Sequence, residues 1–287
     1  MIKIIFFDID GTLVNRHAKA LDSTKRAIAL AQSQGILCGV ATGRSPIHLS
    51  QQIDSLELDV FVTYNGQLVY TEDQTLYERT FTKAELETLV SFADKGNRQM
   101  MFGGRAQMDG SSLMKFGQNS KARKLVRFIP SWFPVAMVKR LLDLLRYRFK
   151  KENCRYHELD IINESIYQCV LLSPENEMDE LKKQLPDCTI TRSNPYVVDI
   201  IPKGGSKLKG IAKCIESFDI SLSEVMVFGD NWNDVEMLQG SGIGVAMGNA
   251  PEGVKAVADF VTNTNENHGI YEAMVHYGII EEAAYEN

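Results

Sequence analysis

The feature that most constrains this chain is an apolar run near its start that ends abruptly in acidic residues. Residues 4–7 read Ile-Ile-Phe-Phe, and the sequence Asp-Ile-Asp-Gly-Thr-Leu follows at residues 8–13. An apolar run without polar alternation is typical of a strand buried on both faces, as in a parallel sheet covered by helices. Ligands of open α/β sheets bind beyond the carboxyl ends of the strands. Asp8 and Asp10 are therefore expected where a ligand would bind.

The spacing of these two aspartates has a chemical consequence. In an extended segment, residues two apart place their side chains on the same face, so Asp8 and Asp10 can act together. One carboxylate can attack as a nucleophile while the other transfers the proton of the leaving group or of water. Gly11 permits the sharp turn that follows, and Thr12 can tie that turn to the backbone. A pair of solvated loop aspartates is the alternative, but it explains poorly why they follow a buried strand.

Further polar residues are expected at the same edge of the sheet. A strand predicted over residues 36–41 ends at Thr42, and one predicted over 225–228 ends before Asp230. Lys207 begins another predicted helix. Strands that alternate with helices in this way imply right-handed crossovers and a parallel sheet. Because the carboxyl ends of neighbouring parallel strands meet at one edge, we expect these side chains to converge with the two aspartates.

Carboxylates that converge in this way repel one another. At about 4 Å and an effective dielectric constant of about 20, a pair of unit charges costs about 4 kcal/mol. Several ionised aspartates at one site therefore require a cation, and an all-oxygen ligand set favours a hard ion, Mg²⁺ first. Because Mg²⁺ prefers phosphate oxygens, the site is expected to bind phosphate. Lys207 would then neutralise the phosphoryl group, and the Thr42 hydroxyl would orient it.

The composition argues against several classes of function. The 287 residues carry a formal net charge of -6, so no overall basic field attracts nucleic acid or an anionic membrane. No apolar stretch approaches the ~20 residues that span a bilayer. The five cysteines are widely spread without CxxC spacing, which indicates reduced thiols rather than disulfides or a zinc site. The chain opens directly on a predicted strand, so we expect no leader and a cytoplasmic protein. Its oligomeric state is not indicated.

From about residue 82 the pattern changes to short strands and helices without acidic strand ends. Helices are predicted over residues 83–94, 135–149 and 175–184. We therefore predict an α+β domain over residues 82–201, inserted into a first domain formed by residues 1–81 and 202–287.

Within the insert, residues 115–155 are strongly basic. Twelve lysines and arginines face only two acidic residues there, in a chain whose net charge is negative. We interpret this stretch as the solvated face of long helices. One alternative is a positive lid that attracts an anionic substrate. A nucleic-acid surface is less well supported, because aromatic residues are sparse and the rest of the chain is acidic.

Taken together, the motifs resemble those of the haloacid dehalogenase (HAD) superfamily, in its Cof-like branch with a large α/β cap. Four segments carry the resemblance, in the family's order and with an insert between the second and third: residues 8–13, 41–44, 206–207 and 229–234. The resemblance implies an α/β fold, in which a Rossmann-like parallel sheet has helices on both faces. It also implies that the inserted α+β domain is a cap that sets substrate specificity.

The resemblance further implies a role for each matched residue. Asp8 would be the nucleophile and Asp10 the acid and base, with Thr42 and Lys207 completing the catalytic set. Mg²⁺ would bind Asp8, Asp10 through its backbone carbonyl, and Asp230. From its place in the same loop, rather than from the resemblance, Asp234 is expected to orient Lys207 or a metal-bound water. The implied phosphate ligands are the backbone N–H of Ile9, Thr42, Gly43, Lys207 and Asn233.

We therefore expect a Mg²⁺-dependent phosphatase that hydrolyses a small phosphorylated metabolite through an aspartyl-phosphate. An acid at position 10 resembles the phosphatase branch, because dehalogenases lack it. Sugar phosphates, pyridoxal phosphate and flavin mononucleotide are all compatible with the resemblance. The alternatives are a phosphosugar mutase or phosphotransferase of the same fold, and a non-catalytic phosphoacceptor or binding protein. His268, in the last loop, is expected to be structural.

Overall fold

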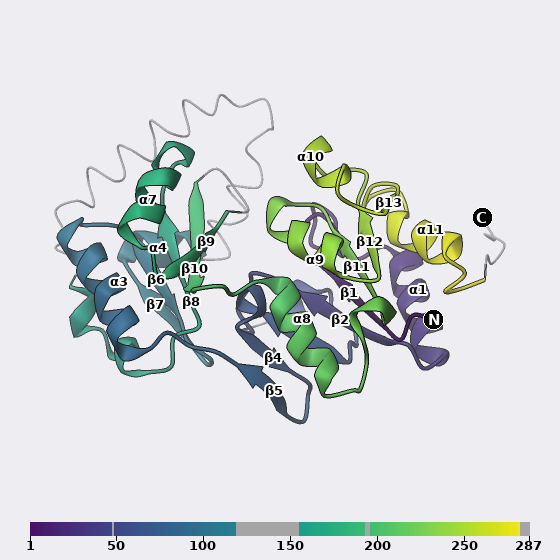
Figure 1. The fold of residues 1–287 in the computed structure, drawn as a ribbon, viewed down its shortest axis with the longest axis horizontal. Helices are drawn as coiled ribbons and strands as arrows, with labels where there is room; N and C mark the ends of the chain where they lie inside the picture. Colours follow the sequence, from purple (N-terminus) through teal and green to yellow (C-terminus); the bar gives the residue numbers. More distant parts are fainter. Residues whose placement is uncertain (48, 119–154, 193–195, 282–287) are drawn as a thin grey trace. The chain divides into compact units, whose positions relative to one another are not determined.

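The computed structural model describes residues 1–47, 49–118, 155–192 and 196–281, and the chain divides into two compact units (Figure 1). The core unit comprises Met1–Arg79, Thr191–Ser193 and Ile201–Asn287, and the insert unit comprises Thr80–Ile190 and Asn194–Ile200. The helix predicted over 135–149 and most of the basic stretch lie outside the described residues. No helix among the residues described is long and apolar enough to cross a membrane.

The core unit is built on one eight-stranded sheet. Its strands are β1 (Ile4–Phe7), β2 (Leu37–Ala41), β3 (Val60–Thr63), β4 (Leu68–Tyr70), β5 (Thr75–Glu78), β11 (Val225–Gly229), β12 (Ile243–Ala246) and β13 (Phe260–Val261). They lie in the order β13-β12-β11-β1-β2-β3-β4-β5. The pairs from β13 to β3 are parallel, whereas β4 and β5 add antiparallel at one edge. The predicted parallel core is confirmed, and β5 was not predicted.

Helices cover both faces of this sheet, as predicted (Figure 1). One face packs against α1 (Asp22–Ser33), α2 (Leu49–Gln52) and α11 (Gly269–His276), and the other against α8 (Lys207–Glu216), α9 (Val235–Gly240) and α10 (Glu252–Lys255). In β1, Ile5 and Phe7 belong to the first hydrophobic core, and Ile4 and Phe6 belong to the second. Because both faces are covered, the run has no place for polar alternation.

The turn between β3 and β4 is formed by Tyr64–Gly66, whose Asn-Gly pair is typical of hairpin turns. Asn65 and Gly66 both adopt left-handed backbone conformations, with φ of 52° and 89°. A Cβ on Gly66 would lie 2.1 Å from the carbonyl oxygen of Ser206, so only glycine lets the turn pack against the start of α8. The Ser45-Pro46 pair is typical of a helix start, but α2 begins only at Leu49. The Leu49 N–H closes a turn onto the Pro46 carbonyl at 3.2 Å.

The insert unit has its own sheet and its own hydrophobic core. Its strands are β6 (Met100–Gly103), β7 (Met108–Gly110), β8 (Gln168–Leu172), β9 (Cys188–Thr191) and β10 (Val197–Pro202), in the order β7-β6-β8-β10-β9. Its described helices are α3 (Lys83–Lys95), α4 (Ser112–Gln118) and α7 (Met178–Gln184). The apolar faces of α3 and α7 pack against β6, β8 and β10.

Short 3₁₀ turns join several of these elements. They are η1 (Tyr64–Gly66), η2 (Tyr156–Glu158), η3 (Asp160–Asn163), η4 (Glu175–Glu177), η5 (Leu222–Glu224) and η6 (Trp232–Asp234). Among the described cysteines, Cys38, Cys169, Cys188 and Cys214 are free thiols. Burial raises the pKa of all four thiols, which disfavours the reactive thiolate.

Candidate active site

Strand register brings the predicted site residues to one edge of the core sheet. β1 lies between β2 and β11, with Phe7 opposite both Val40 and Phe228. The three strands are parallel, so their carboxyl ends deliver Asp8, Thr42 and the loop of Asp230 side by side. This convergence is what the sequence predicted for the edge of the sheet.

Lys207 lies at the centre of this site. Its ammonium donates to Asp8 Oδ1 at 2.5 Å and to Asp234 Oδ1 at 2.6 Å, and its side chain is only 1% exposed. Burial opposes the charge of Lys207, but the two carboxylates outweigh burial and raise its pKa. Ser206 precedes it as the helix cap and accepts from the Lys209 N–H at 3.3 Å, so α8 begins where the lysine is needed.

Asp234 fixes the loop that carries the fourth motif. Its carboxylate is fully buried, and while Oδ1 holds Lys207, Oδ2 accepts from the backbone N–H groups of Asp230 and Asn231 at 3.0 Å each. Both oxygens of Asp234 are therefore occupied by protein donors. This arrangement suits a residue that orients the lysine and the loop, and it leaves little capacity for a cation.

Three carboxylates in the described chain are close enough to hold a metal ion. Oxygens of Asp8, Asp230 and Asp234 all lie within 4.8 Å of one another. Burial is the main reason why the pKa of Asp8 rises to about 8 and that of Asp230 to about 7, and neighbouring aspartates add to both shifts. The single ammonium of Lys207 does not balance this charge. A hard divalent cation would, so the donor set fits one.

The loop after β1 is shaped around Asp230. Gly11 has φ of +86°, and a Cβ there would lie 2.3 Å from Asp230 Oδ2. The Thr12 hydroxyl donates to Asp230 Oδ1 at 3.0 Å, instead of tying its own turn as predicted. The Asn249 amide donates to the Gly11 carbonyl at 2.8 Å and reaches Asp230 Oδ2 at 3.5 Å. Asn249 was not predicted, because a lone asparagine before a short helix carries no distinctive signal.

Asp10 is the predicted residue whose surroundings differ most from those of Asp8. Its side chain is 62% exposed, and both carboxylate oxygens accept from the guanidinium of Arg44. The Nε–Oδ2 distance is 2.7 Å, and Nη2 binds Oδ1. Arg44 belongs to the second motif, but no role was predicted for it.

The predicted phosphate ligands lie around the same edge. Ile9 and Thr42 are buried, and Gly43 lies two residues beyond the end of β2. The Asn233 amide lies 3.4 Å from Asn65 Oδ1, so the β3–β4 turn also approaches the site. The buried side chain of Asn65 was missed, because a Tyr-Asn-Gly sequence reads as a turn only. His268 lies against α1, where its Nδ1 is 2.8 Å from Ser23 Oγ, and this contact suits the structural role expected for it.

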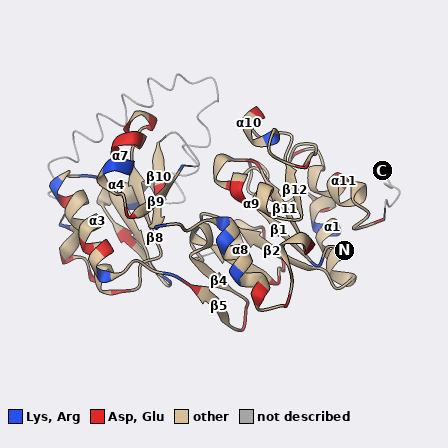
Figure 2. Ribbon diagram, in the orientation of Figure 1, with Lys and Arg blue, Asp and Glu red and all other residues tan. Residues whose placement is uncertain are grey.

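Charge is unevenly distributed among the helices of the described chain. Figure 2 shows mainly basic residues along α8, which contains three lysines, whereas α3 and α7 carry both signs. The lysine at the first position of α8 is the one whose side chain enters the site. An anion bound there would also meet the favourable dipole of the helix N-terminus.

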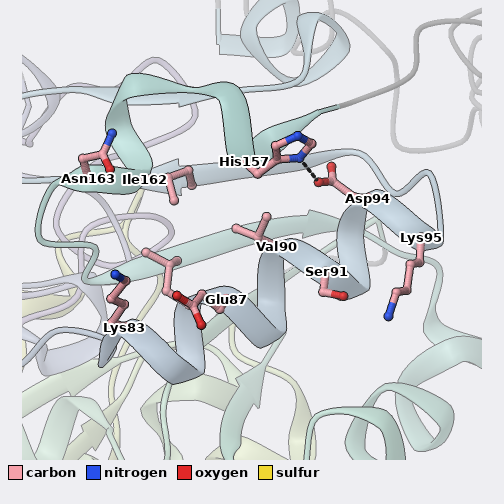
Figure 3. A pocket seen from close by; sticks show the side chains of 10 residues that line it. Lys83, Glu87, Val90, Ser91, Asp94, Lys95, His157, Ile162 and Asn163 are labelled. Carbon is pink, nitrogen blue, oxygen red and sulfur yellow. Dashed lines mark hydrogen bonds and ion pairs between the residues drawn. The ribbon is translucent and has the colours of Figure 1, made fainter.

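A groove lies within the insert unit and contains none of the predicted site residues. The groove lies between α3 and the η2–η3 segment (Figure 3), and its volume is about 500 Å³. Leu86, Val90 and Ile162 provide apolar lining, and His157 Nδ1 lies 2.9 Å from Asp94 Oδ2. Its mixed lining offers no convergent acids or phosphate donors comparable to those of the core unit, so the candidate active site is the cluster around Lys207.

Comparison with known proteins identifies the family. Residues 5–274 match the model of a haloacid dehalogenase-like hydrolase family. YkrA of Bacillus subtilis (strain 168) is 30% identical over 279 residues, covering 97% of this chain and 99% of YkrA. The 5-amino-6-(5-phospho-D-ribitylamino)uracil phosphatase YcsE of the same organism is 29% identical, with 96% of each chain covered.

The solved structures give the same result at the level of the fold. The structure of the HAD subclass IIB sugar phosphatase BT4131 is 32% identical, with a TM-score of 0.75 and coverage of 97% of this chain and 100% of that one. All four motif segments lie within the matched residues 5–274. The chain therefore belongs to the haloacid dehalogenase-like hydrolase family, in its Cof-like branch, and is an enzyme of the phosphatase class.

Proposed function

We propose that this protein is a Mg²⁺-dependent phosphatase that hydrolyses small phosphomonoesters through a covalent intermediate on Asp8. The observation that carries the proposal is the position of Lys207, buried between Asp8 and Asp234 with Asp230 beside them. An ammonium held next to a buried carboxylate can neutralise a phosphoryl group while the carboxylate attacks it.

We assign the metal to the carboxylates of Asp8 and Asp230, with the backbone carbonyl of Asp10 as a third ligand. The raised pKa values of Asp8 and Asp230 support this choice, because buried carboxylates gain most from a cation. Bound Mg²⁺ would neutralise charge on the phosphoryl oxygens and orient them for attack. Asp234 is not assigned to the metal, since its two oxygens bind Lys207 and the loop N–H groups.

In the first half-reaction, a carboxylate oxygen of ionised Asp8 attacks phosphorus. The bond from phosphorus to the leaving-group oxygen breaks, and protonated Asp10 gives its proton to that oxygen, so that an alcohol departs. Lys207 stays paired with the phosphoryl group and with Asp234. The Thr42 hydroxyl and the backbone N–H groups of Ile9 and Gly43 would orient the phosphoryl oxygens.

In the second half-reaction, Asp10 is ionised and acts as a base. It takes a proton from water while the water oxygen attacks phosphorus, and the bond to Asp8 breaks. Inorganic phosphate leaves, Asp8 is again a carboxylate and Asp10 is again protonated. Asn233 would hydrogen-bond the phosphate during both steps, from the loop that Asp234 fixes.

We propose that the substrate is a small phosphorylated metabolite, of the sugar phosphate, pyridoxal phosphate or flavin mononucleotide type. The names of YcsE and BT4131 support the sugar-like class, since one describes a phosphoribitylamino compound and the other a sugar phosphatase. We assign specificity to a cap formed by residues 82–201, because the proposed catalytic residues all belong to the core unit. A cytoplasmic location would suit such a substrate.

The test is turnover of p-nitrophenyl phosphate with and without Mg²⁺, followed by a panel of phosphorylated metabolites. We expect Asp8→Asn to abolish turnover and Asp10→Asn to reduce it strongly. Asp73→Asn, in an exposed loop of the same unit, is the matched control and should keep full activity. Undiminished turnover by Asp8→Asn would refute the mechanism. Phosphate transferred to a sugar rather than to water would indicate a phosphotransferase instead.

A further inference from the structure

The pairing of Asp10 with Arg44 bears directly on when this aspartate can act. Both carboxylate oxygens accept hydrogen bonds from one guanidinium, and no other described side chain hydrogen-bonds to Asp10. The carboxylate is otherwise exposed to solvent. A bidentate guanidinium pair is stronger and more directional than hydrogen bonds between neutral groups. The orientation of Asp10 therefore depends on Arg44.

Arg44 is itself held from several directions. Its Nη1 donates to Gln52 Oε1 at 2.6 Å, and the Gln52 amide in turn donates to the Ile47 carbonyl at 3.0 Å. Its backbone N–H donates to the Thr42 hydroxyl at 3.1 Å, and its carbonyl accepts from the Tyr64 N–H at 3.0 Å. These contacts hold the guanidinium in place just beyond the end of β2, where it donates hydrogen bonds to the Asp10 carboxylate.

We propose that Arg44 is a positioning residue that acts through Asp10. It holds the Asp10 carboxylate at the strand ends, ready for the proton transfers that our proposed function assigns to it, on which this inference rests. Without Arg44, an exposed carboxylate would sample several rotamers. A misplacement of about 1 Å can cost about 100-fold in rate.

A different role for Arg44 would be direct binding of the substrate phosphate, and kinetics separate the two. A residue that binds phosphate affects every phosphomonoester alike and changes KM. A residue that positions Asp10 as the acid affects kcat/KM, which covers the steps up to departure of the leaving group, and mainly for substrates whose leaving group needs a proton. Its effect on Asp10 as the base of the second step lowers kcat for all substrates alike. An alkoxide leaves poorly without a proton, whereas p-nitrophenolate is a stable anion that needs little help.

The experiment compares p-nitrophenyl phosphate with an alkyl phosphate, such as glycerol phosphate, for the wild type, Arg44→Gln, Arg44→Lys, Asp10→Asn and the double variant Arg44→Gln/Asp10→Asn. For Arg44→Gln we expect kcat/KM on the alkyl phosphate to fall about 10- to 100-fold. We expect less than about a threefold change in kcat/KM on p-nitrophenyl phosphate, whose kcat falls only through slower hydrolysis of the covalent intermediate, and no rise in KM for either substrate. Arg44→Lys keeps the charge but not the two-point contact, so it should restore only part of the loss.

The double variant provides the sharpest outcome. If Arg44 acts through Asp10, the Arg44→Gln change should add no further leaving-group selectivity in the Asp10→Asn background. Gln52→Leu should give a weaker version of the same selective loss without removing any charge, which keeps the proposal testable if Arg44→Gln folds poorly. Arg26→Gln, an exposed position in α1, is the control.

Two results would overturn the inference. The first is an equal loss of kcat/KM on both substrates with a raised KM, or full recovery in Arg44→Lys, either of which would make Arg44 a phosphate-binding residue. The second is a loss that adds fully to that of Asp10→Asn. Failure of the proposed function would look different, because Asp8→Asn would then retain activity whatever Arg44 does.

Discussion

Replacing Lys207 by methionine should remove activity and also destabilise the fold. Methionine keeps the length of the side chain but leaves the carboxylates of Asp8 and Asp234 buried without their shared ammonium, which now lies 2.5 and 2.6 Å from them. Removing one partner of a buried ion pair costs about 3–5 kcal/mol, because an uncompensated charge remains. We expect the free energy of unfolding of the metal-free protein to fall by about that amount.

The assay is urea unfolding of the metal-free protein, together with turnover of p-nitrophenyl phosphate. Lys209→Met is the matched control, because it lies on the same helix with an exposed side chain, and its stability should change by less than about 0.5 kcal/mol. The loss in Lys207→Met should shrink as the pH is lowered, since protonation neutralises the stranded carboxylates. Adding Asp234→Asn should relieve part of it. Equal stability of the two lysine variants, or retained turnover in Lys207→Met, would refute the reasoning.

Three further predictions concern the proposed metal ligands Asp8 and Asp230 and the loop after β1 that packs against Asp230. The pKa values of about 8 for Asp8 and about 7 for Asp230 exceed the ordinary value of 3.8. Between about pH 4 and about pH 8 the metal-free native state therefore binds more protons than the unfolded state, so its free energy of unfolding should fall as the pH rises. Mg²⁺ should therefore raise Tm more at about pH 8.5 than at about pH 5.5, and a shift independent of pH would contradict this. Thr12→Val removes the hydroxyl that donates to Asp230, and should weaken Mg²⁺ binding about 10-fold by calorimetry, whereas an unchanged Kd would exclude such a role. Gly11→Ala places a Cβ 2.3 Å from Asp230 Oδ2 at a left-handed φ, so it should lower both Tm and turnover, and wild-type values for both would contradict the geometry.

Much of the fold was predictable because its signals are local. The unbroken apolar run of β1 predicted burial on both faces, and the two hydrophobic cores on either side of Phe6 and Phe7 confirm it. The Asn65-Gly66 turn was equally predictable, since few residues accept left-handed conformations. The edge strand β5 was missed, because its Thr-Leu-Tyr-Glu sequence is short and half exposed.

The candidate site was predictable where parallel topology alone decides which residues meet. Neighbouring parallel strands end at one edge of the sheet, and this brings Asp8 and Asp230 together whatever the path of the connecting segments. The partners of individual side chains were not predictable. Whether the Thr12 hydroxyl turns to its own backbone or to Asp230, and whether Arg44 meets Asp10, depends on loop paths that no periodicity encodes.

The covalent step on Asp8 is tested most directly by trapping its product. Asp10→Asn, which lacks the base for the second half-reaction, is mixed with Mg²⁺ and p-nitrophenyl phosphate, quenched in acid and digested for mass spectrometry. We predict that the peptide containing Asp8 carries one added phosphoryl group, at close to one per protein molecule, and that Asp8→Asn/Asp10→Asn carries none. Release of p-nitrophenol and phosphate by Asp10→Asn without any phosphoryl group on Asp8, at any quench time, would contradict the account.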